Sequence, residues 1–280
     1  MKGKTYRTRI APTVSGLLHI GHARTFLAAC DRAREFGGKV VLRIDDIDSQ
    51  RCSRAYEDAA IEDMRSAGVH WDEGPDVGGE YGPYRQSERI YMYESAMERL
   101  IRGGFVYPSP HSRSEIKKLA RSCARTFPFC DAEPIFPEAL RPLSTATVEE
   151  LKNFRNFNWR FRVPDGEKIS FRDSLAGDME FVCGEDFGDF LVWRKSAEPS
   201  YELASAVDDW LMDITEIVRG EDLLLSTARQ ILVWRALGAE IPDFRHCPLL
   251  RGDNGEKLSK TSIAKSGGSK WLICRRKGKL

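Results

Sequence analysis

The first forty-four residues hold the pattern that most constrains the fold. Residues 7–11 have the character of a short extended segment, and residues 39–44 form a β-branched run of strand length. Over residues 20–36, Ala, Leu and Phe recur at spacings of three and four, which predicts a helix that Gly37 and Gly38 end. A strand, a helix and a second strand within about 35 residues make a βαβ unit, whose strands pair in parallel. The chain is therefore predicted to have an α/β fold.

Farther along, the pattern predicts further helices, a loop and one irregular region. Residues 71–85 are rich in Gly, Pro and acidic residues and are predicted to be a loop. Residues 107–142 are rich in proline and aromatic residues, which indicates an inserted subdomain. Apolar and polar residues alternate within 158–190, so we expect strands there. The remaining predictions are helices over residues 54–67, 89–102, 203–210 and 226–237 and a strand over residues 214–218.

Charge and cysteine content limit the class of protein. The chain has 43 basic and 42 acidic residues, but residues 266–280 hold five basic side chains and no acidic one. The remainder carries 38 basic against 42 acidic residues, so a nucleic acid would have to be bound by a local patch. The seven cysteines are scattered and no signal-peptide pattern is present, so we expect reduced thiols in a cytoplasmic protein. No apolar run is long enough to predict a membrane span.

A short motif with two histidines lies where the first strand leads into the helix. It reads Leu18-His19-Ile20-Gly21-His22. A helix N-terminus offers unpaired N–H groups and the positive end of a dipole, both of which suit a phosphate. Gly21 would let a flat ring approach the backbone closely. Taken alone, the motif also fits two surface histidines near a helix cap.

A second motif, Lys257-Leu258-Ser259-Lys260-Thr261, follows a Gly-containing stretch late in the chain. Its two ammonium groups are suited to neutralising a triphosphate. On its own, such a segment is more often a solvated charged loop. Together, in this order and about 235 residues apart, the two motifs resemble the HIGH and KMSKS motifs that make the ATP site of class I aminoacyl-tRNA synthetases.

Four longer stretches resemble the glutamyl branch of that class. They read RIAPTVSGLLHIGHART at 9–25, RIDDID at 43–48, GPYRQSER at 82–89 and VRGEDLLLSTARQ at 218–230. The resemblance covers about residues 6–264 and implies a Rossmann-type parallel-sheet nucleotide-binding fold with an inserted α/β subdomain for the acceptor end of tRNA. The segments it implies are the first half of the catalytic domain (1–105), the inserted subdomain (106–195), the second half of the catalytic domain (196–265) and a basic tail (266–280).

Length distinguishes groups within the glutamyl branch. Full-length glutamyl-tRNA synthetases add a helical anticodon-binding region after the second motif, whereas few residues follow it here. The chain therefore resembles the group of glutamyl-queuosine tRNA(Asp) synthetases, which are free-standing catalytic domains without an anticodon-binding domain. This resemblance implies ATP-dependent activation of L-glutamate to glutamyl-AMP and transfer to the queuosine base of tRNA(Asp), by a monomer. A truncated glutamyl-tRNA synthetase charging tRNA(Glu) and a non-catalytic paralogue that binds tRNA stay open as alternatives.

The resemblance also implies roles in ATP binding and catalysis. His19 and His22 would hold the ATP phosphates and stabilise the transition state, and Gly21 would lie under the adenosine. The second motif would neutralise the departing pyrophosphate through Lys257 and Lys260, with Leu258 and Ser259 between them in the ATP site. The nucleotide is expected to enter as ATP with Mg²⁺.

Glutamate carries one ammonium and two carboxylates, so its pocket should contain cations and at least one acid. By motif position, Arg9, Tyr201 and Arg219 match the carboxylate-binding residues of the family, and Asp45 matches its ammonium-binding acid. Arginine suits this task because its planar fork pairs with a carboxylate bidentately. Asp45 stands where the family usually has Glu, which shortens its reach by a methylene. The alternatives are a structural salt bridge for Arg219 and a core aromatic for Tyr201.

The queuosine group often carries a zinc site of the form C-x-C followed by Y-x3-C, from which this chain departs. Here Ser109 and His111 stand in the two Cys positions of C-x-C. Phe136 and Leu140 stand in the Tyr and Cys positions of Y-x3-C. Because a structural zinc ion takes four ligands, we expect no zinc and an insertion held together by its aromatic and proline residues. One substitute set of metal ligands stays open: His111, Cys123 and Cys130.

Basic residues in the insertion are candidates for an RNA surface. Their helical spacing fits either an RNA-binding face or a solvated helix face. They are Arg113, Lys117, Lys118, Arg121 and Arg125. The basic residues of the tail around Trp271 leave the same choice open.

Overall fold

The computed structural model of the chain describes residues 5–18, 20–123, 125, 127, 134–143, 150 and 152–249. Their contacts divide them into two compact units. Unit 1 holds the described residues up to Arg89, Asp213–Glu221 and those from Pro242 onward, and unit 2 holds those of Ile90–Met212 and Asp222–Ile241. The four segments expected from the sequence stay a prediction. Among the described residues, no helix has the length and apolar character needed to cross a membrane.

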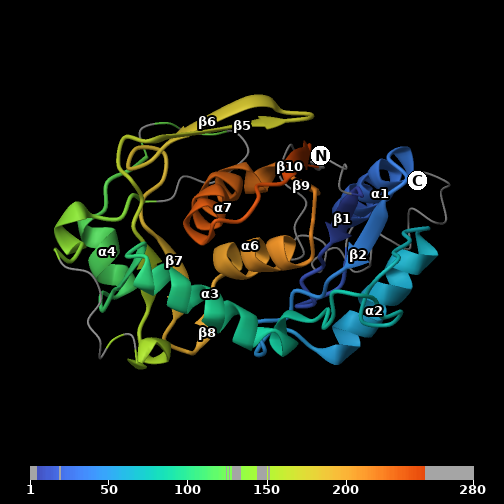
Figure 1. Cartoon of the computed structure of the whole chain (residues 1–280), viewed down its shortest axis with the longest axis horizontal. Coiled ribbons are helices and arrows are strands. Elements are labelled where there is room, and N and C mark those ends of the chain that lie inside the picture. Colours follow the sequence, from blue (N-terminus) through green and yellow to red (C-terminus); the bar gives the residue numbers. More distant parts are fainter. Residues whose placement is uncertain are drawn as a thin grey trace. The chain divides into compact units, whose positions relative to one another are not determined.

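Unit 1 begins with the βαβ unit that the sequence predicts. Strand β1 (Arg7–Ile10), helix α1 (Ile20–Glu35) and strand β2 (Lys39–Leu42) follow one another, and β1 pairs in parallel with β2 (Figure 1). After α1 the chain turns at Gly37, which has a φ of +59°, a conformation that favours glycine. A Cβ on Gly38 would lie 2.3 Å from the Tyr6 carbonyl oxygen, so only glycine lets β2 start beside β1.

A second parallel pair lies beside β1. Strand β9 (Glu216–Gly220) pairs with β10 (Asp243–Cys247). Thr215 N donates to the Arg7 carbonyl oxygen at 2.9 Å, and the Arg9 guanidinium reaches the Val218 carbonyl oxygen at 3.2 Å, so β1 and β9 advance in the same direction. The sequence prediction placed this strand two residues too early. The carboxyl ends of β1, β2, β9 and β10 therefore share one edge, which is where open parallel sheets bind ligands.

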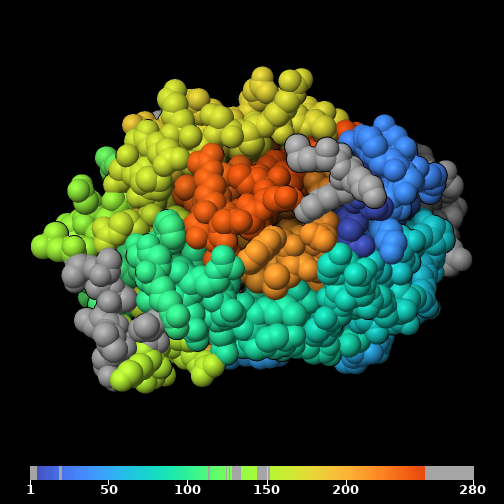
Figure 2. Space-filling view, in the orientation of Figure 1, coloured from blue at the N-terminus to red at the C-terminus, as the bar shows by residue number. Residues whose placement is uncertain are grey.

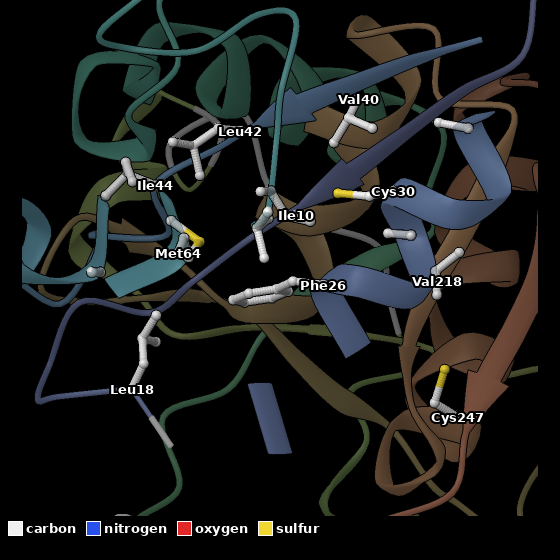
Figure 3. Packing of buried hydrophobic residues seen from close by; sticks show 14 of the residues in the cluster. Ile10, Leu18, Phe26, Cys30, Val40, Leu42, Ile44, Met64, Val218 and Cys247 are labelled. Carbon is white, nitrogen blue, oxygen red and sulfur yellow. The ribbon is translucent and has the colours of Figure 1, made fainter. Parts of the chain in front are cut away.

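The core of unit 1 lies between α1 and these strands. Figure 3 shows Ile10 of β1, Phe26 and Cys30 of α1, and Val218 of β9 in one buried cluster. An Ile, Phe or Val side chain contributes about 1.5–3 kcal/mol when fully buried. Helix α2 (Arg54–Ser66), which the sequence predicts, adds Met64 to the cluster. The core thus holds the strands and α1 in fixed register at the edge where their carboxyl ends meet.

Unit 2 contains three helices that pack on one another. They are α3 (Ile90–Arg102), α6 (Tyr201–Leu211) and α7 (Leu224–Leu237), and both ends of each lie within two residues of a sequence prediction. Their side chains adjoin on the face seen in Figure 2, where α6 and α7 are orange and α3 is blue-green. Trp234 of α7 donates to the Ala206 carbonyl oxygen at 2.8 Å, and the Tyr93 hydroxyl bonds the buried Asp208 carboxylate at 2.9 Å. These buried polar contacts fix the packing of the three helices.

The strands of unit 2 pair in antiparallel fashion. Some of them lie within residues 158–190, where the alternation of apolar and polar residues predicts strands. One sheet has the order β3 (Val106–Pro108), β4 (Trp159–Phe161), β7 (Phe190–Arg194) and β8 (Glu198–Pro199). A hairpin joins β5 (Lys168–Asp173) and β6 (Gly177–Val182). Short 3-10 turns occupy Gln86–Glu88, Glu138–Leu140, Phe154–Asn156 and Glu221–Leu223.

One prediction for the insertion is wrong in part. Helix α4 (Arg113–Leu119) starts at a capping box between Ser112 and Glu115 and ends at Leu119, so the basic residues that follow it do not continue its face. Arg121 donates to the Gly184 carbonyl oxygen at 2.7 Å, and Arg125 forms an ion pair with Asp186. These two arginines tie the insertion together. Lys117 and Lys118 are exposed on α4.

Candidate active site

Residues from four elements of unit 1 lie at the shared edge of the parallel strands. Arg9 comes from β1, Arg219 from β9, and Asp45 from the segment just after β2. Gly21 and His22 belong to the first turn of α1, which follows the loop after β1. The fold therefore brings to one edge five residues that the sequence analysis singled out.

Arg9 and Arg219 are both buried, at 3% and 4% exposure. Arg9 Nη1 donates to the Val218 carbonyl oxygen at 3.2 Å, which ties it to the residue that precedes Arg219. Two guanidinium groups are thus held on adjacent strands in a place that water reaches poorly. Such a place favours a ligand with carboxylate groups.

Arg219 contacts a residue that the sequence analysis missed. Its Nε donates to His246 Nε2 at 3.1 Å, and His246 is only 2% exposed. The two residues are direct partners in the register of β9 and β10. The alternative of a structural salt bridge between Arg219 and an acid stays open. In the sequence, His246 is only a histidine that comes shortly before the second motif. The sequence does not show which residue of another strand lies beside it.

Asp45 is held by Arg43, a second residue that the sequence analysis missed. Arg43 Nε bonds Asp45 Oδ1 at 2.7 Å, and Nη2 bonds Oδ2 at 3.3 Å. Both residues are buried, at 0% and 7% exposure, and the Asp45 N–H donates to the Pro12 carbonyl oxygen at 3.1 Å. The carboxylate is thereby fixed beside the loop that leads into α1. The pair with Arg43 fixes the orientation of the carboxylate, and the role of Asp45 toward an ammonium group stays a prediction.

The first turn of α1 is a candidate anion-binding element. Gly21 and His22 are half-buried, and the His22 ring lies 6.1 Å from the Phe26 ring, one turn farther along. The Gly21 carbonyl accepts a hydrogen bond from the Thr25 hydroxyl at 3.1 Å. The sixteen-residue helix directs its N-terminal dipole toward this end. His19 lies outside the described residues, as do Lys257, Leu258, Ser259 and Lys260.

Residues 5–273 match the family described as "tRNA synthetases class I (E and Q), catalytic domain". The chain belongs to this family. It therefore has the class I synthetase catalytic fold with mixed α/β content, and the parallel βαβ unit with α1 at the strand ends is part of that fold. The resemblance stated from the motifs is confirmed.

Relatives of two kinds share this catalytic domain. The chain is 44% identical over 256 residues to the glutamyl-Q tRNA(Asp) synthetase of Symbiobacterium thermophilum, which covers 90% of this chain and 77% of that protein. It is 42% identical over 255 residues to glutamate–tRNA ligase 2 of Syntrophus aciditrophicus, covering 91% and 51%. The crystal structure of glutamate-tRNA synthetase from Elizabethkingia anophelis matches with a TM-score of 0.78 and 29% identity, covering 95% and 54%. The chain thus spans about half the length of the glutamate–tRNA ligases it matches.

The fourth predicted glutamate-binding residue of this synthetase-family chain lies in the other unit. Tyr201 is the first residue of α6, after Ser200, whose hydroxyl accepts a hydrogen bond from Leu203 N at 3.4 Å. Tyr201 is 38% exposed, which contradicts the alternative of a core aromatic. Its membership in one pocket with Arg9, Asp45 and Arg219 stays a prediction.

The structure describes part of the region in which the sequence analysis looked for a zinc motif. Phe136 is buried against Tyr107, with 6.2 Å between ring centroids, and the Arg160 guanidinium lies 4.4 Å from the Phe136 ring centroid. The Tyr107 hydroxyl donates to Asp189 at 2.6 Å. Among the residues that the structure describes, no group of three or more His, Cys, Asp or Glu is arranged to hold a metal ion. Cys130 lies outside those residues, so the substitute set with His111 and Cys123 stays a prediction, as does the expectation of no zinc.

Proposed function

We propose that the protein activates L-glutamate with ATP to form glutamyl-AMP and transfers the glutamyl group to the queuosine base of tRNA(Asp). The observation that carries the choice of amino acid is the pair of buried arginines on β1 and β9, at the strand edge of a class I synthetase fold. The 44% identity to a glutamyl-Q tRNA(Asp) synthetase, over 77% of that relative's length, supports the choice of tRNA.

Activation begins when a carboxylate oxygen of glutamate attacks the α-phosphorus of ATP and pyrophosphate departs. Such a reaction needs position and charge stabilisation more than a protein nucleophile. In this proposal Arg9 and Arg219 bind carboxylate groups and Asp45 binds the ammonium. Transfer follows when a hydroxyl of the acceptor attacks the acyl carbon, which forms an ester and releases AMP.

The phosphates of ATP would lie at the first turn of α1. His22 stabilises the negative charge that develops there, together with the helix N-terminus and, as expected from the motif, His19. Gly21 lets the adenosine approach the backbone. Lys257 and Lys260, with Leu258 and Ser259 between them, are proposed to neutralise the pyrophosphate. Mg²⁺ enters with the triphosphate, because this ion is commonly bound through substrate phosphates, and supplies additional positive charge.

A second candidate is a ligase that charges tRNA(Glu). The 42% identity to a glutamate–tRNA ligase and the TM-score of 0.78 to another favour it. The two candidates share the activation step and differ in the acceptor. The expectations of a monomer and of a cytoplasmic location stay predictions under both, as does the alternative of a paralogue that binds tRNA without catalysis.

The test is glutamate-dependent exchange of pyrophosphate into ATP, run with and without tRNA, followed by transfer of labelled glutamate. Exchange without tRNA, with label passing to queuosine-containing tRNA(Asp) whose 3′-terminal adenosine has been removed, is the expected result. Label that requires queuosine but not the terminal adenosine places the ester on the base. Exchange that depends on tRNA(Glu), with label lost when its terminal adenosine is removed, would favour the second candidate. No exchange under any condition would contradict both.

A further inference from the structure

The partner of Arg219 is set by strand register. Arg219 of β9 and His246 of β10 are opposite one another in the parallel pairing, so their side chains leave the same face of the two strands. The residues next to them, Val218 and Cys247, belong to the hydrophobic cluster of unit 1 (Figure 3). The core therefore fixes both strands from one side, which fixes the placement of Arg219 and His246 on the other.

The hydrogen bond between them defines the state of the imidazole. The Nε of arginine always carries a proton and donates at 3.1 Å, so His246 Nε2 must accept. The ring is then neutral, with its own proton on Nδ1. The Phe244 ring lies two residues before it on β10, with 6.3 Å between ring centroids.

A neutral acceptor orients a guanidinium without cancelling its charge. The contact engages Nε, so a two-point pair with a carboxylate would use the fork formed by Nη1 and Nη2. We infer that His246 is a positioning residue for Arg219: it fixes the plane of the guanidinium so that the fork meets a carboxylate of the amino-acid substrate. This inference rests on the function proposed above. Its consequence is that His246 affects affinity for glutamate and its discrimination from glutamine without touching the substrate.

The distinguishing readout is a separation of KM from kcat. Arg219 binds a carboxylate in the ground state and in the transition state alike, so loss of its orientation raises the glutamate KM and leaves kcat nearly unchanged. His246→Leu removes the acceptor and keeps similar bulk, and is expected to raise the glutamate KM about tenfold, with the ATP KM little changed. His246→Gln keeps an acceptor oxygen at a similar reach, and is expected to hold the KM within about threefold of the parent protein.

A matched control separates orientation from damage to the strand. Cys247→Ala alters the next position of β10, whose side chain packs into the core. It is expected to lower the melting temperature at least as much as His246→Leu does and to leave the glutamate KM unchanged. A KM that rises equally in His246→Gln, or that follows the melting temperature across all three variants, would overturn the inference.

A spectroscopic measurement tests the contact independently of activity. In protein labelled with ¹⁵N-histidine at neutral pH, the His246 ring is expected to show an unprotonated Nε2 and a protonated Nδ1. A cationic ring, or one protonated on Nε2, would overturn the inference even in an active enzyme. If the parent protein shows the expected ring and no glutamate-dependent exchange, the proposed function fails while the contact stands. If exchange is normal and His246→Leu leaves the KM unchanged, the inference fails while the function stands.

Discussion

The two ends of the parallel strands in unit 1 use arginines in different ways. At the amino ends, Arg7 bonds the Glu73 carboxylate at 2.7 and 3.2 Å, and Arg32 bonds the Glu216 carboxylate at 3.0 and 2.8 Å. At the carboxyl ends, Arg9 and Arg219 donate to a carbonyl oxygen and to an imidazole. A carboxylate partner cancels the charge of a guanidinium, whereas a neutral partner only orients it. The carboxylate pairs at the amino ends serve stability, and in the function proposed above the carboxyl ends serve binding, although Arg7 and Arg9 lie two residues apart on one strand.

The ion pair of Arg43 with Asp45 shows that the carboxyl ends are not simply positive. Its acid is fixed by two contacts from one arginine and by its own backbone N–H. The acid Asp45 and the arginines Arg9 and Arg219 lie on one edge. In the proposed function their charges are opposite to those of the ammonium and carboxylate groups of an amino acid. Removing any of them should affect substrate binding first, and four measurements test this division.

The largest effect is expected from His22→Ala. The imidazole is placed at the N-terminus of α1, where charge develops in the transition state, so its loss should lower the rate of glutamate-dependent exchange by about a hundred- to a thousandfold. Because His22 is half-buried and its ring lies 6.1 Å from the Phe26 ring, the free energy of unfolding should change by less than about 1 kcal/mol. Arg34→Ala, at an exposed position near the end of the same helix, is the matched control and should leave both quantities unchanged. Near-normal exchange in His22→Ala would remove this residue from the site.

Glu73→Ala tests the opposite end of the strands. The substitution leaves the buried Arg7 guanidinium without its carboxylate and removes the acceptor of the Tyr84 hydroxyl, which bonds Glu73 at 2.8 Å. We expect the free energy of unfolding to fall by about 3 kcal/mol, measured by urea denaturation. Exchange activity per folded molecule should stay within about twofold, since no substrate group is proposed to bind there.

Replacing both partners is the control for Glu73→Ala. In the double variant Arg7→Met, Glu73→Leu no buried charge is left alone, so much of the lost stability should return. If Glu73→Ala lowered activity per folded molecule as far as His22→Ala does, the division between a stabilising end and a binding end of the strands would be contradicted.

Arg219→Ala should act on substrate selection. Loss of a carboxylate-binding fork is expected to raise the glutamate KM about thirtyfold, with a smaller change in the ATP KM. Preference for glutamate over glutamine should fall, because the amide needs no cation. Arg219→Lys keeps the charge without the fork, so its glutamate KM should lie between those of the parent protein and Arg219→Ala. Amino-acid selectivity that stays at the level of the parent protein would place Arg219 outside the pocket.

The elements that the sequence predicts well are those with a local signal. The spacing of Ala, Leu and Phe and the double glycine at residues 37–38 define α1, the β-branched run at 39–44 indicates β2, and the parallel pairing with β1 follows from their order. The prediction that the basic residues of the insertion share one helix face was wrong in part, because periodicity does not mark where a helix stops. A chain that leaves α4 at Leu119 places Arg121 and Arg125 against the backbone and side chains of residues 184–186.

The site is predictable in its motif residues and not in their partners. Arg9, Gly21, His22, Asp45 and Arg219 stand in recognisable stretches of the sequence. His246 lies outside those stretches, and Arg43 is the first residue of one of them. The roles of both could not be predicted, because they depend on strand register and on which buried groups face one another. Tyr201 was singled out by motif position, and only its exposure argues against the core alternative.

The smallest expected effect concerns the pH dependence of stability at the amino ends. The hydrogen bond from Arg7 holds the pKa of Glu73 below its ordinary value of 4.5, against the opposing effect of burial. A carboxyl whose pKa is lower in the folded state contributes stability that is present above the unfolded pKa and is lost as the pH falls through the folded pKa. The free energy of unfolding of the parent protein should therefore decrease more steeply below pH 4.5 than that of Glu73→Gln, which cannot titrate. Urea denaturation at a series of pH values measures the difference between the two slopes. Equal slopes would show that the Arg7–Glu73 pair does not distinguish the folded from the unfolded carboxyl, and the contrast between the two ends of the strands would lose its electrostatic basis.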